Sequence, residues 1–471
     1  MPHGGAPRAC CRAIMGPIES PRSPTGFCIQ PKKRQQPLEE TRVLHMYLNL
    51  LKKRLIATWD YIAGGGWMRS GSVTTVLLAL ILGTAFFIIH ERGKGHLTQL
   101  RNKMEGDVRP PVASGPKPGG VEPLVLTRPQ PTGQTGPEFA SVTLLPGLGM
   151  SVLQMTAFVP GHGEIPLLAA PTAEQLVSTP PPAAQGPNDD HGAFELPWSG
   201  ALIGSPAPVG DRMVVRWQEQ AMTLPSAATK PSRAYGGLLR RQAAGEVTQD
   251  VVPDGTSATA TFTATDFDGD WPGKIQTKVS VVMVGSRMDL SVIATNSGSA
   301  PLPIGIGWHP RFAIRGDRKS VSLKLPEASR METSEITRGM PTGKTLSAGS
   351  QLEQFMGKQM VALGNTALND LLVEMKPSLL EDGPIAEMRF PSEGYGIRMR
   401  LVSASIRSLR VVADPAQPYL SLGPQVNFDD PLGHQWDRNM EMPVLAPGAS
   451  MEWRIKLDLF PLTGQSSSLI E

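Results

Sequence analysis

The sequence predicts an all-β fold, a large antiparallel β-sandwich, preceded by one transmembrane helix and a Pro/Gly-rich linker. Three observations predict it: short alternating or β-branched runs between turn residues, one uncharged apolar run near the N-terminus, and a proline- and glycine-rich stretch between the two. We place a disordered segment at 1–67, the helix at 68–92, the linker at 105–139 and the β-sandwich domain at 140–462.

The N-terminal third of the chain contains the membrane signal. Residues 1–67 are rich in Pro, Arg, Lys and Gly, which favours disorder. Residues 72–89 contain no charged side chain and match the roughly 20 residues that span a bilayer. No A-x-A-like cleavage site follows at His90–Lys94, so we expect an uncleaved anchor. Basic residues flank the helix on both sides and leave its orientation open, and we expect an inner-membrane anchor with the domain in the periplasm or otherwise outside the cytoplasm.

The linker at 105–139 is dominated by Pro and Gly, which predicts a semi-extended spacer. Beyond it, long helical periodicity is absent, and short runs with strand character recur between polar turns. Such a series is typical of a sandwich with mainly antiparallel pairing. The expected strands are 140–145, 213–217, 258–265, 274–284, 288–295, 321–325, 396–402, 408–412 and 451–459.

Composition excludes several classes of function. With Lys+Arg 45 against Asp+Glu 42, the net charge of +3 is too small to indicate a nucleic-acid partner. The three cysteines lie near the N-terminus, and the histidines of the domain show no metal-ligand spacing. The acidic stretch 266–270 resembles the start of a calcium loop, but Trp271 stands at the position where such a loop has its glycine. We interpret the stretch as a hairpin turn. No metal site and no cofactor is expected.

One histidine, His309, stands in unusual surroundings. It follows Gly305 and Gly307 and precedes Pro310, and glycines there are expected to leave room for a ligand to approach the backbone. A lone histidine is more often structural than catalytic, so both interpretations are open from these residues alone.

The segment around His309 resembles the aldose 1-epimerase family. A strand ending in Thr295-Asn296 leads through Pro303-Ile-Gly-Ile-Gly-Trp-His309-Pro310, similar to the family's pattern before its catalytic histidine. Further similar motifs occur in the family's order at Gly237–Arg240, Asp270–Gly273, Pro418–Gly433 and Leu445–Ser450. The resemblance implies a galactose mutarotase-like supersandwich and a reaction on a free sugar that needs an acid and a base but no cofactor.

Carried over by position, the family's catalytic residues are only partly present. His309 falls on the catalytic acid, whereas the base position reads Gly423 in Leu422-Gly-Pro-Gln425. The family's second histidine aligns with Gly236 and its arginine with Ala201, so three polar groups are missing. We expect no carboxylate within direct reach of the place vacated at Gly423.

Four other residues are candidates for substrate binding. The family's aspartate maps to Asn369 or Asp370, Arg311 stands where a tyrosine is usual, and Gln425 follows the altered base motif. Arg311 is either a solvated charge at the rim or a partner for an anionic sugar such as a uronate or phosphate ester. If another group takes the role of the base, the available carboxylates are Asp370 and the pair Asp429 and Asp430.

These substitutions predict a carbohydrate-binding protein rather than an ordinary epimerase. Removing a general base costs roughly 10² to 10⁴ in rate, so mutarotation of a free aldose is expected to be weak or absent. The expected partners are a free monosaccharide or sugar derivative and the membrane. The alternative is a non-catalytic, membrane-anchored scaffold or interaction domain of the cell envelope.

Overall fold

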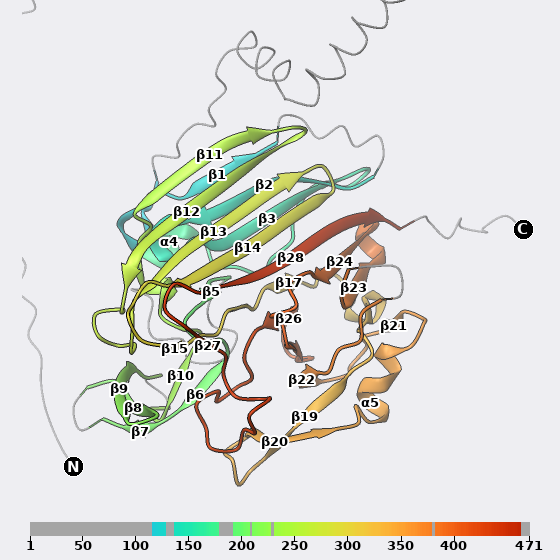
Figure 1. Ribbon diagram of the computed structural model, residues 1–471. Helices are drawn as coiled ribbons and strands as arrows, with labels where there is room; N and C mark the ends of the chain where they lie inside the picture. Colours follow the sequence, from blue (N-terminus) through green and yellow to red (C-terminus); the bar gives the residue numbers. More distant parts are fainter. Residues whose placement is uncertain are drawn as a thin grey trace, which may run out of the picture. The chain divides into compact units, whose positions relative to one another are not determined.

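Two large antiparallel sheets form most of the computed structural model (Figure 1), which describes residues 115–128, 136–178, 192–207, 210–227, 230–378 and 382–462. All of these belong to one unit, His90–Glu471. The predicted disordered segment 1–67 and helix 68–92 lie outside the described residues. Within the described ranges, no helix is both long and apolar enough to cross a membrane.

The larger sheet has nine strands, and the long strand β28 lies near its middle, between β14 and β24 (Figure 1). Alternation explains why its strands form, because buried Val279 and Val281 on β13 alternate with more exposed Lys278 and Ser280. In spatial order the strands are β11 (Glu246–Val252), β12 (Gly255–Thr265), β13 (Ile275–Val284), β14 (Arg287–Asn296), β28 (Ser450–Pro461), β24 (Tyr395–Leu401), β23 (Ile385–Phe390), β18 (Ser322–Lys324) and β21 (Val361–Ala362).

The second sheet has eight strands, and His309 directly follows one of them, β16. Seven lie in the order β20 (Met340–Leu346), β19 (Ser329–Ser334), β22 (Leu368–Val373), β25 (Ser408–Ala413), β26 (Tyr419–Gln425), β16 (Gly307–Trp308) and β5 (Phe194–Glu195). The eighth strand, β17 (Arg311–Ala313), also pairs with β26. Neighbouring strands in the two sheets pair antiparallel, as predicted.

A third sheet of four strands corrects the predicted start of the domain. It consists of β1 (Leu124–Thr127), β2 (Glu138–Leu145), β3 (Ser151–Val159) and β4 (Gly163–Pro166). Strand β1 and the start of β2 fall in the stretch predicted to be a linker, and Leu126 and Phe139 are completely buried. The β-rich unit therefore begins before residue 140, because apolar side chains among the prolines reach the core.

Short elements complete the described chain. Three small sheets are formed by β7 (Ser205–Pro206), β8 (Arg212–Trp217) and β9 (Gln220–Pro225), by β6 (Ala201–Ile203) with β10 (Arg233–Tyr235), and by β15 (Leu302–Pro303) with β27 (Val444–Leu445). The α-helices are α4 (Ala173–Ser178) and α5 (Ser350–Glu353). The 3₁₀ turns are η2 (Pro118–Gly120), η3 (Pro146–Leu148), η4 (Leu239–Arg241), η5 (Arg318–Ser320), η6 (Gln354–Met356) and η7 (Pro391–Glu393).

One apolar core joins the three larger sheets. The same cluster of buried side chains includes Leu290 and Trp453 of the nine-stranded sheet, Trp308 and Leu422 of the eight-stranded sheet, and Phe139 of the four-stranded sheet. Burying apolar surface from both large sheets against each other is what defines a sandwich. The predicted all-β sandwich is confirmed for the described residues.

The nine strands predicted from the sequence are all present, and no end differs from the prediction by more than three residues. The acidic stretch 266–270 forms the turn between β12 and β13, as predicted, and Asp270 pairs with Arg212. Strand β26 was not predicted, because Gly423 and Pro424 in its sequence are residues that normally weaken a strand.

Candidate functional site

Alternation along three short strands separates an aromatic layer from a polar one. Phe194 of β5 and Trp308 of β16 pair with each other and belong to the core, where their rings stack at 6.3 Å. The next residue in each pairing lies on the other face: Gly307 pairs with Glu195 and with Gln425 of β26. The strands therefore place Glu195 and Gln425 on the face turned away from this aromatic layer. Both lie opposite Gly307, two residues before His309.

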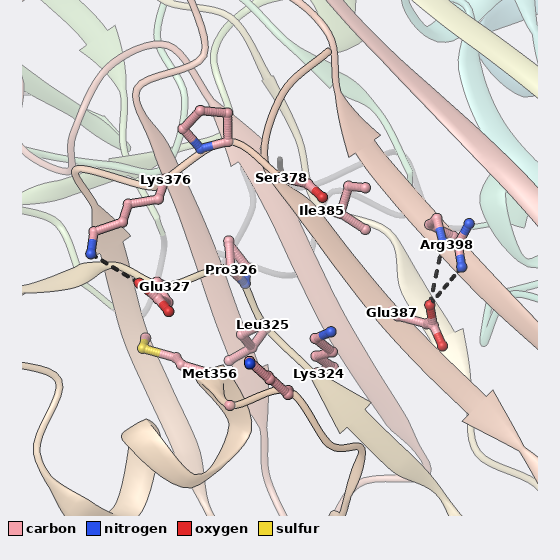
Figure 2. Close-up of a pocket in the computed structure, with 13 residues that line it drawn as sticks. Lys324, Leu325, Pro326, Glu327, Met356, Lys376, Ser378, Ile385, Glu387 and Arg398 are labelled. Atoms are coloured by element: carbon pink, nitrogen blue, oxygen red, sulfur yellow. Dashed lines mark hydrogen bonds and ion pairs between the residues drawn. The ribbon is translucent and has the colours of Figure 1, made fainter. Parts of the chain in front are cut away.

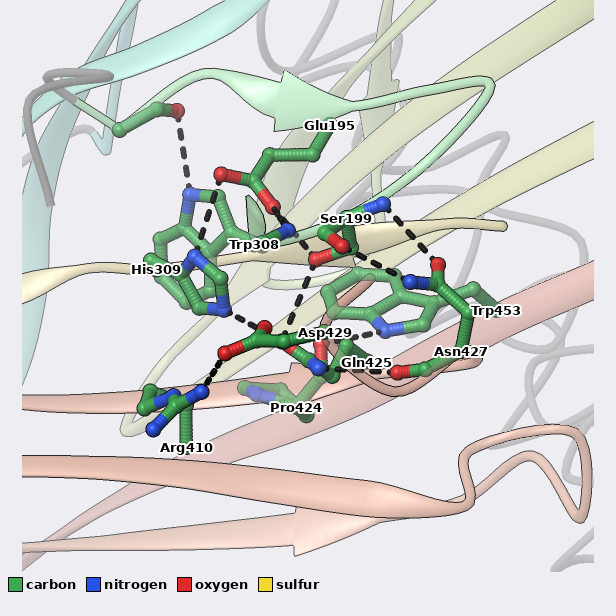
Figure 3. Close-up of polar contacts among 12 residues, drawn as sticks. Glu195, Ser199, Trp308, His309, Arg410, Pro424, Gln425, Asn427, Asp429 and Trp453 are labelled. Carbon is green, nitrogen blue, oxygen red and sulfur yellow. Dashed lines mark hydrogen bonds and ion pairs between the residues drawn. The ribbon is translucent and has the colours of Figure 1, made fainter. Parts of the chain in front are cut away.

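His309 is completely buried between two acceptors (Figure 3). Its Nδ1 lies 3.1 Å from Glu195 Oε1, and its Nε2 lies 2.9 Å from Gln425 Oε1. The amide nitrogen of Gln425 donates to the Asn427 carbonyl at 2.8 Å, which turns the amide oxygen of Gln425 toward the imidazole. Since both ring nitrogens face oxygen acceptors, this arrangement favours an imidazolium that donates two hydrogen bonds.

Glu195 is the counter-charge of this imidazolium. The Ser199 hydroxyl donates to its Oε2, and the Gly200 N–H donates to the same oxygen at 2.7 Å. Burial alone raises the pKa of Glu195, but the charge of His309 and the hydrogen bonds from His309, Ser199 and Gly200 outweigh it, so the pKa lies below its ordinary value. Glu195 is therefore ionised at neutral pH.

Close packing explains the glycines that precede His309. The backbone N–H of Ser199 donates to Asn427 Oδ1 at 2.9 Å, and Asn427 Nδ2 donates to the Ser199 carbonyl at 2.8 Å. A Cβ on Gly305 would lie 1.8 Å from Asn427 Oδ1, and one on Gly307 would lie 2.0 Å from Ser199 Oγ. The expectation that these glycines leave room for a ligand is wrong, because side chains of the protein fill the space.

Gly423 accommodates the imidazole itself. A Cβ at this position would lie 1.7 Å from His309 Cδ2 and 2.5 Å from Nε2. The place where the resemblance puts the catalytic base is thus occupied by the ring of the proposed acid. Glu195, which contacts this ring from β5, was not among the predicted site residues; alternation in a two-residue strand is too short a signal to single it out.

A buried ion pair lies beside this network. Arg410 of β25 is opposite Gly423 in the register and pairs with Asp429, both side chains being nearly inaccessible (Figure 3). Burial lowers the pKa of Arg410 to about 10, against the opposing charges of Asp370 and Glu195. Within the described chain, Asp429 Oδ1 and Arg410 Nε have no hydrogen-bond partner.

Asp430, which was also proposed as a replacement base, forms hydrogen bonds with other groups of the protein. Asp430 Oδ1 accepts the Ile203 N–H at 3.1 Å, and its Oδ2 accepts from Gln435 Nε2 at 3.2 Å. Burial raises the pKa of Asp430 despite these bonds. Asp429 and Asp430 are therefore each held by other groups of the protein, rather than standing free beside His309.

The predicted binding residues differ in exposure: Asn369 is exposed, Arg311 and Asp370 are half-buried, and Gln425 is buried. Arg311 and Asn369 lie in one row across four strands. In the strand register Arg311 is opposite Ser421, Ser421 is opposite Val412, and Val412 is opposite Asn369. The guanidinium of Arg311 lies over the Tyr419 ring at 5.0 Å, and Asn369 is exposed.

Asp370 and Gln425 are placed differently. Asp370 pairs with Val411, one position out of the row, and its oxygen accepts the Asn369 N–H at 3.3 Å. Gln425 is completely buried and holds His309. In the present conformation a ligand on the outer surface can meet Arg311 and Asn369 but not Gln425.

Comparison with known proteins agrees with this fold. Residues 184–404 match the family model described as aldose 1-epimerase, a range that includes Glu195, His309, Arg311 and Asn369. The domain is aldose 1-epimerase-like. No curated protein matches the chain.

Solved structures share the fold at low identity. A galactose mutarotase-like protein from Clostridium acetobutylicum is 14% identical with a TM-score of 0.55, covering 69% of this chain and 93% of its own. An aldose epimerase homologue from C. elegans is 15% identical with a TM-score of 0.53, covering 70% and 97%. A galactose 1-epimerase from Lactobacillus acidophilus NCFM is 9% identical with a TM-score of 0.51, covering 72% and 99%. At these identities the likeness establishes the fold alone.

Proposed function

We propose that the aldose 1-epimerase-like domain is a carbohydrate-binding module in which ordinary mutarotation is lost or strongly impaired. The observation that carries the proposal is the position of the His309 ring, directly over Gly423 and within hydrogen-bonding distance of acceptors at both nitrogens. Opening a hemiacetal ring needs one group that protonates the ring oxygen and another that deprotonates the anomeric hydroxyl. Here the base position holds no carboxylate, and a buried imidazolium donating to Glu195 and Gln425 has no free N–H for a sugar.

The sugar is proposed to lie against the outer row of the eight-stranded sheet. Arg311 and Asn369 provide a fork of N–H donors and an amide on one face, and Tyr419 adds an aromatic ring. Hydroxyl groups hydrogen-bond to such donors, and a uronate or phosphate ester would gain a charge-assisted bond from the guanidinium. His309, over Gly423 on the same face of the sheet, then packs beside the row instead of touching the sugar.

Polarimetry separates binding from turnover. We expect fresh α-glucose and α-galactose to mutarotate at the spontaneous rate with both the wild-type protein and His309→Ala, while a sugar at millimolar concentration raises the melting temperature of the wild type. Arg311→Ala and Asn369→Ala should remove this stabilisation, and Arg216→Ala, an exposed arginine on β8, should keep it. Acceleration by the wild type that disappears in His309→Ala would instead establish an epimerase with His309 as its acid.

A scaffold domain of the cell envelope is the second candidate. This function is favoured by the burial of His309 and its two partners, because Glu195, His309 and Gln425 are each 0% exposed. Absence of any melting-temperature shift with neutral and anionic sugars would favour this function over sugar binding.

For either function we propose attachment to a membrane through residues 72–89, with the domain outside the cytoplasm. The uncharged length of this stretch supports the proposal. The chain should stay with membranes after carbonate washing, and added protease should reach the domain in spheroplasts. Release by carbonate, or protection of the domain in intact spheroplasts, would contradict the anchor or its orientation.

A further inference from the structure

A cationic pocket lies away from the His309 network, at the edge of the nine-stranded sheet (Figure 2). Its wall is formed by β18, β23 and β24, and its rim by the turns after β18, after η6 and after β22. The cavity has a volume of about 620 Å³, within the range of pockets that bind small molecules.

Four cations and two carboxylates line the pocket, which leaves a net charge of +2. The cations are Lys324, Lys358, Lys376 and Arg398, and the carboxylates are Glu327 and Glu387. Like charges gathered in one hollow repel one another unless an anion compensates them.

Both carboxylates already have partners of their own. Glu387 accepts from Arg389 at 2.7 Å through one oxygen and from Arg398 at 3.1 Å through the other. Glu327 lies 2.9 Å from Lys376 Nζ at the rim. The remaining positive charge therefore belongs to the ammonium groups of Lys324 and Lys358, neither of which makes a hydrogen bond or ion pair within the described residues.

The strands fix part of this charge in place. In the strand register Lys324 lies opposite Glu387, and Glu387 lies opposite Arg398. The three residues therefore form one row across β18, β23 and β24. Leu325 and Met356 contribute apolar surface between the charged groups. Strand pairing fixes the backbone of this row, whose net charge is +1, beside apolar surface, and such a site suits a ligand that combines an oxyanion with a small organic body.

We propose that this pocket binds a small organic oxyanion carrying at least two negative charges, a phosphate ester or a polycarboxylate, with Lys324 and Lys358 as its principal contacts. The site is independent of the proposed carbohydrate surface, since no residue of the row from Arg311 to Asn369 lines it.

Calorimetric titration of the full chain tests the site with inorganic phosphate, glycerol 3-phosphate and citrate as probes, and with glucose as a neutral control. At low ionic strength we expect at least one anion to bind and glucose not to bind at this pocket, with affinity falling as salt is added. Binding of the phosphate probes alone assigns a phosphate ester, and binding of citrate alone assigns a polycarboxylate.

Variants locate the binding. Lys324→Ala with Lys358→Ala should weaken anion affinity at least tenfold, while Lys278→Ala, an exposed lysine on β13, should leave it unchanged. Arg311→Ala should also leave it unchanged, which separates this site from the proposed sugar surface. Absence of binding by every anion, or equal loss in Lys278→Ala, would overturn the proposal.

Discussion

At the scale of single residues, the site depends on the His309 ring filling the space that a side chain at Gly423 would occupy. Where the aldose 1-epimerase pattern places a carboxylate, this chain has Gly423, and the His309 ring lies where a side chain would begin. The imidazole then gains Glu195 and Gln425 as partners in a region without solvent. The absence of a side chain at Gly423 therefore leaves the space that the imidazole of this buried ion pair fills.

Restoring the carboxylate by Gly423→Glu should therefore destabilise the protein rather than create an epimerase. The new Cβ would lie 1.7 Å from His309 Cδ2, and overpacking of this kind costs roughly 1–3 kcal/mol or more. Gly357→Ala is a matched control, because a Cβ there meets no atom within 4 Å. Thermal unfolding measures the difference, and faster mutarotation by a stable Gly423→Glu variant would contradict this account.

Glu195→Gln should remove a pH-dependent part of the stability. The folded-state pKa of Glu195 is depressed, so its stabilisation is fully present above the ordinary value of 4.5 and is lost as the pH falls below it toward the folded-state pKa. Breaking a buried ion pair costs on the order of 3 kcal/mol, which the variant should lose at neutral pH.

Urea unfolding at a series of pH values checks this prediction. The wild type should lose stability as the pH falls below 4.5 by more than the variant does. Combining Glu195→Gln with His309→Gln should cost less than the sum of the single changes, because the second removes the charge that the first leaves unpaired. Parallel pH profiles for wild type and variant would show that the pair does not stabilise the fold.

At the scale of elements, short strands decide the position of the site. Strands β5 and β16 contain two residues each, yet their pairing sets which side chains face the core and which face His309. The four-stranded sheet shows the same dependence on few residues, since the four-residue strand β1 brings a proline-rich stretch onto the core through Leu126, which is buried, and Leu124, which packs against the core.

Truncation tests the corrected domain boundary. A chain that starts at residue 140 lacks Leu126 and Phe139, both 0% exposed, whereas a chain that starts at residue 115 keeps them. Loss of large buried side chains costs about 3–5 kcal/mol each, so the shorter chain should unfold at lower temperature or fail to accumulate. Equal melting temperatures for the two chains would show that β1 does not contribute to the fold.

At the scale of the whole described unit, a common core connects the sheets. Leu290 of the nine-stranded sheet and Leu422 of the eight-stranded sheet are both completely buried in the same cluster. Neither sheet can lose its partner without exposing its own apolar face to water.

The two large sheets should consequently unfold together. Leu290→Ala and Leu422→Ala each remove a buried side chain, at a cost of about 2–5 kcal/mol. We expect each variant to shift a single transition seen alike by tryptophan fluorescence and far-ultraviolet circular dichroism. Two transitions, with each substitution affecting a different one, would mean that the sheets are independent units.

Much of the architecture was determined by the sequence itself. Alternation of apolar and polar residues is a local property, and it was sufficient to predict nine strands. The resemblance to the aldose 1-epimerase family was predicted separately, from the motifs around His309, and the family model matches residues 184–404. Strand β26 escaped prediction because Gly423 and Pro424 are poor strand residues whose place is decided by their neighbours in the sheet.

The nature of the site was decided only by the tertiary structure. Glu195 is 114 residues from His309 in the sequence, Ser199 is 228 residues from Asn427, and Arg410 meets Asp429 only through the pairing of β25 and β26 and the turn that follows. Local patterns specify which face of a strand is apolar, but contacts between distant segments depend on how the sheets pack. For this reason the sequence identified His309 as the central residue, and the folded chain determined that it is a buried cation above Gly423.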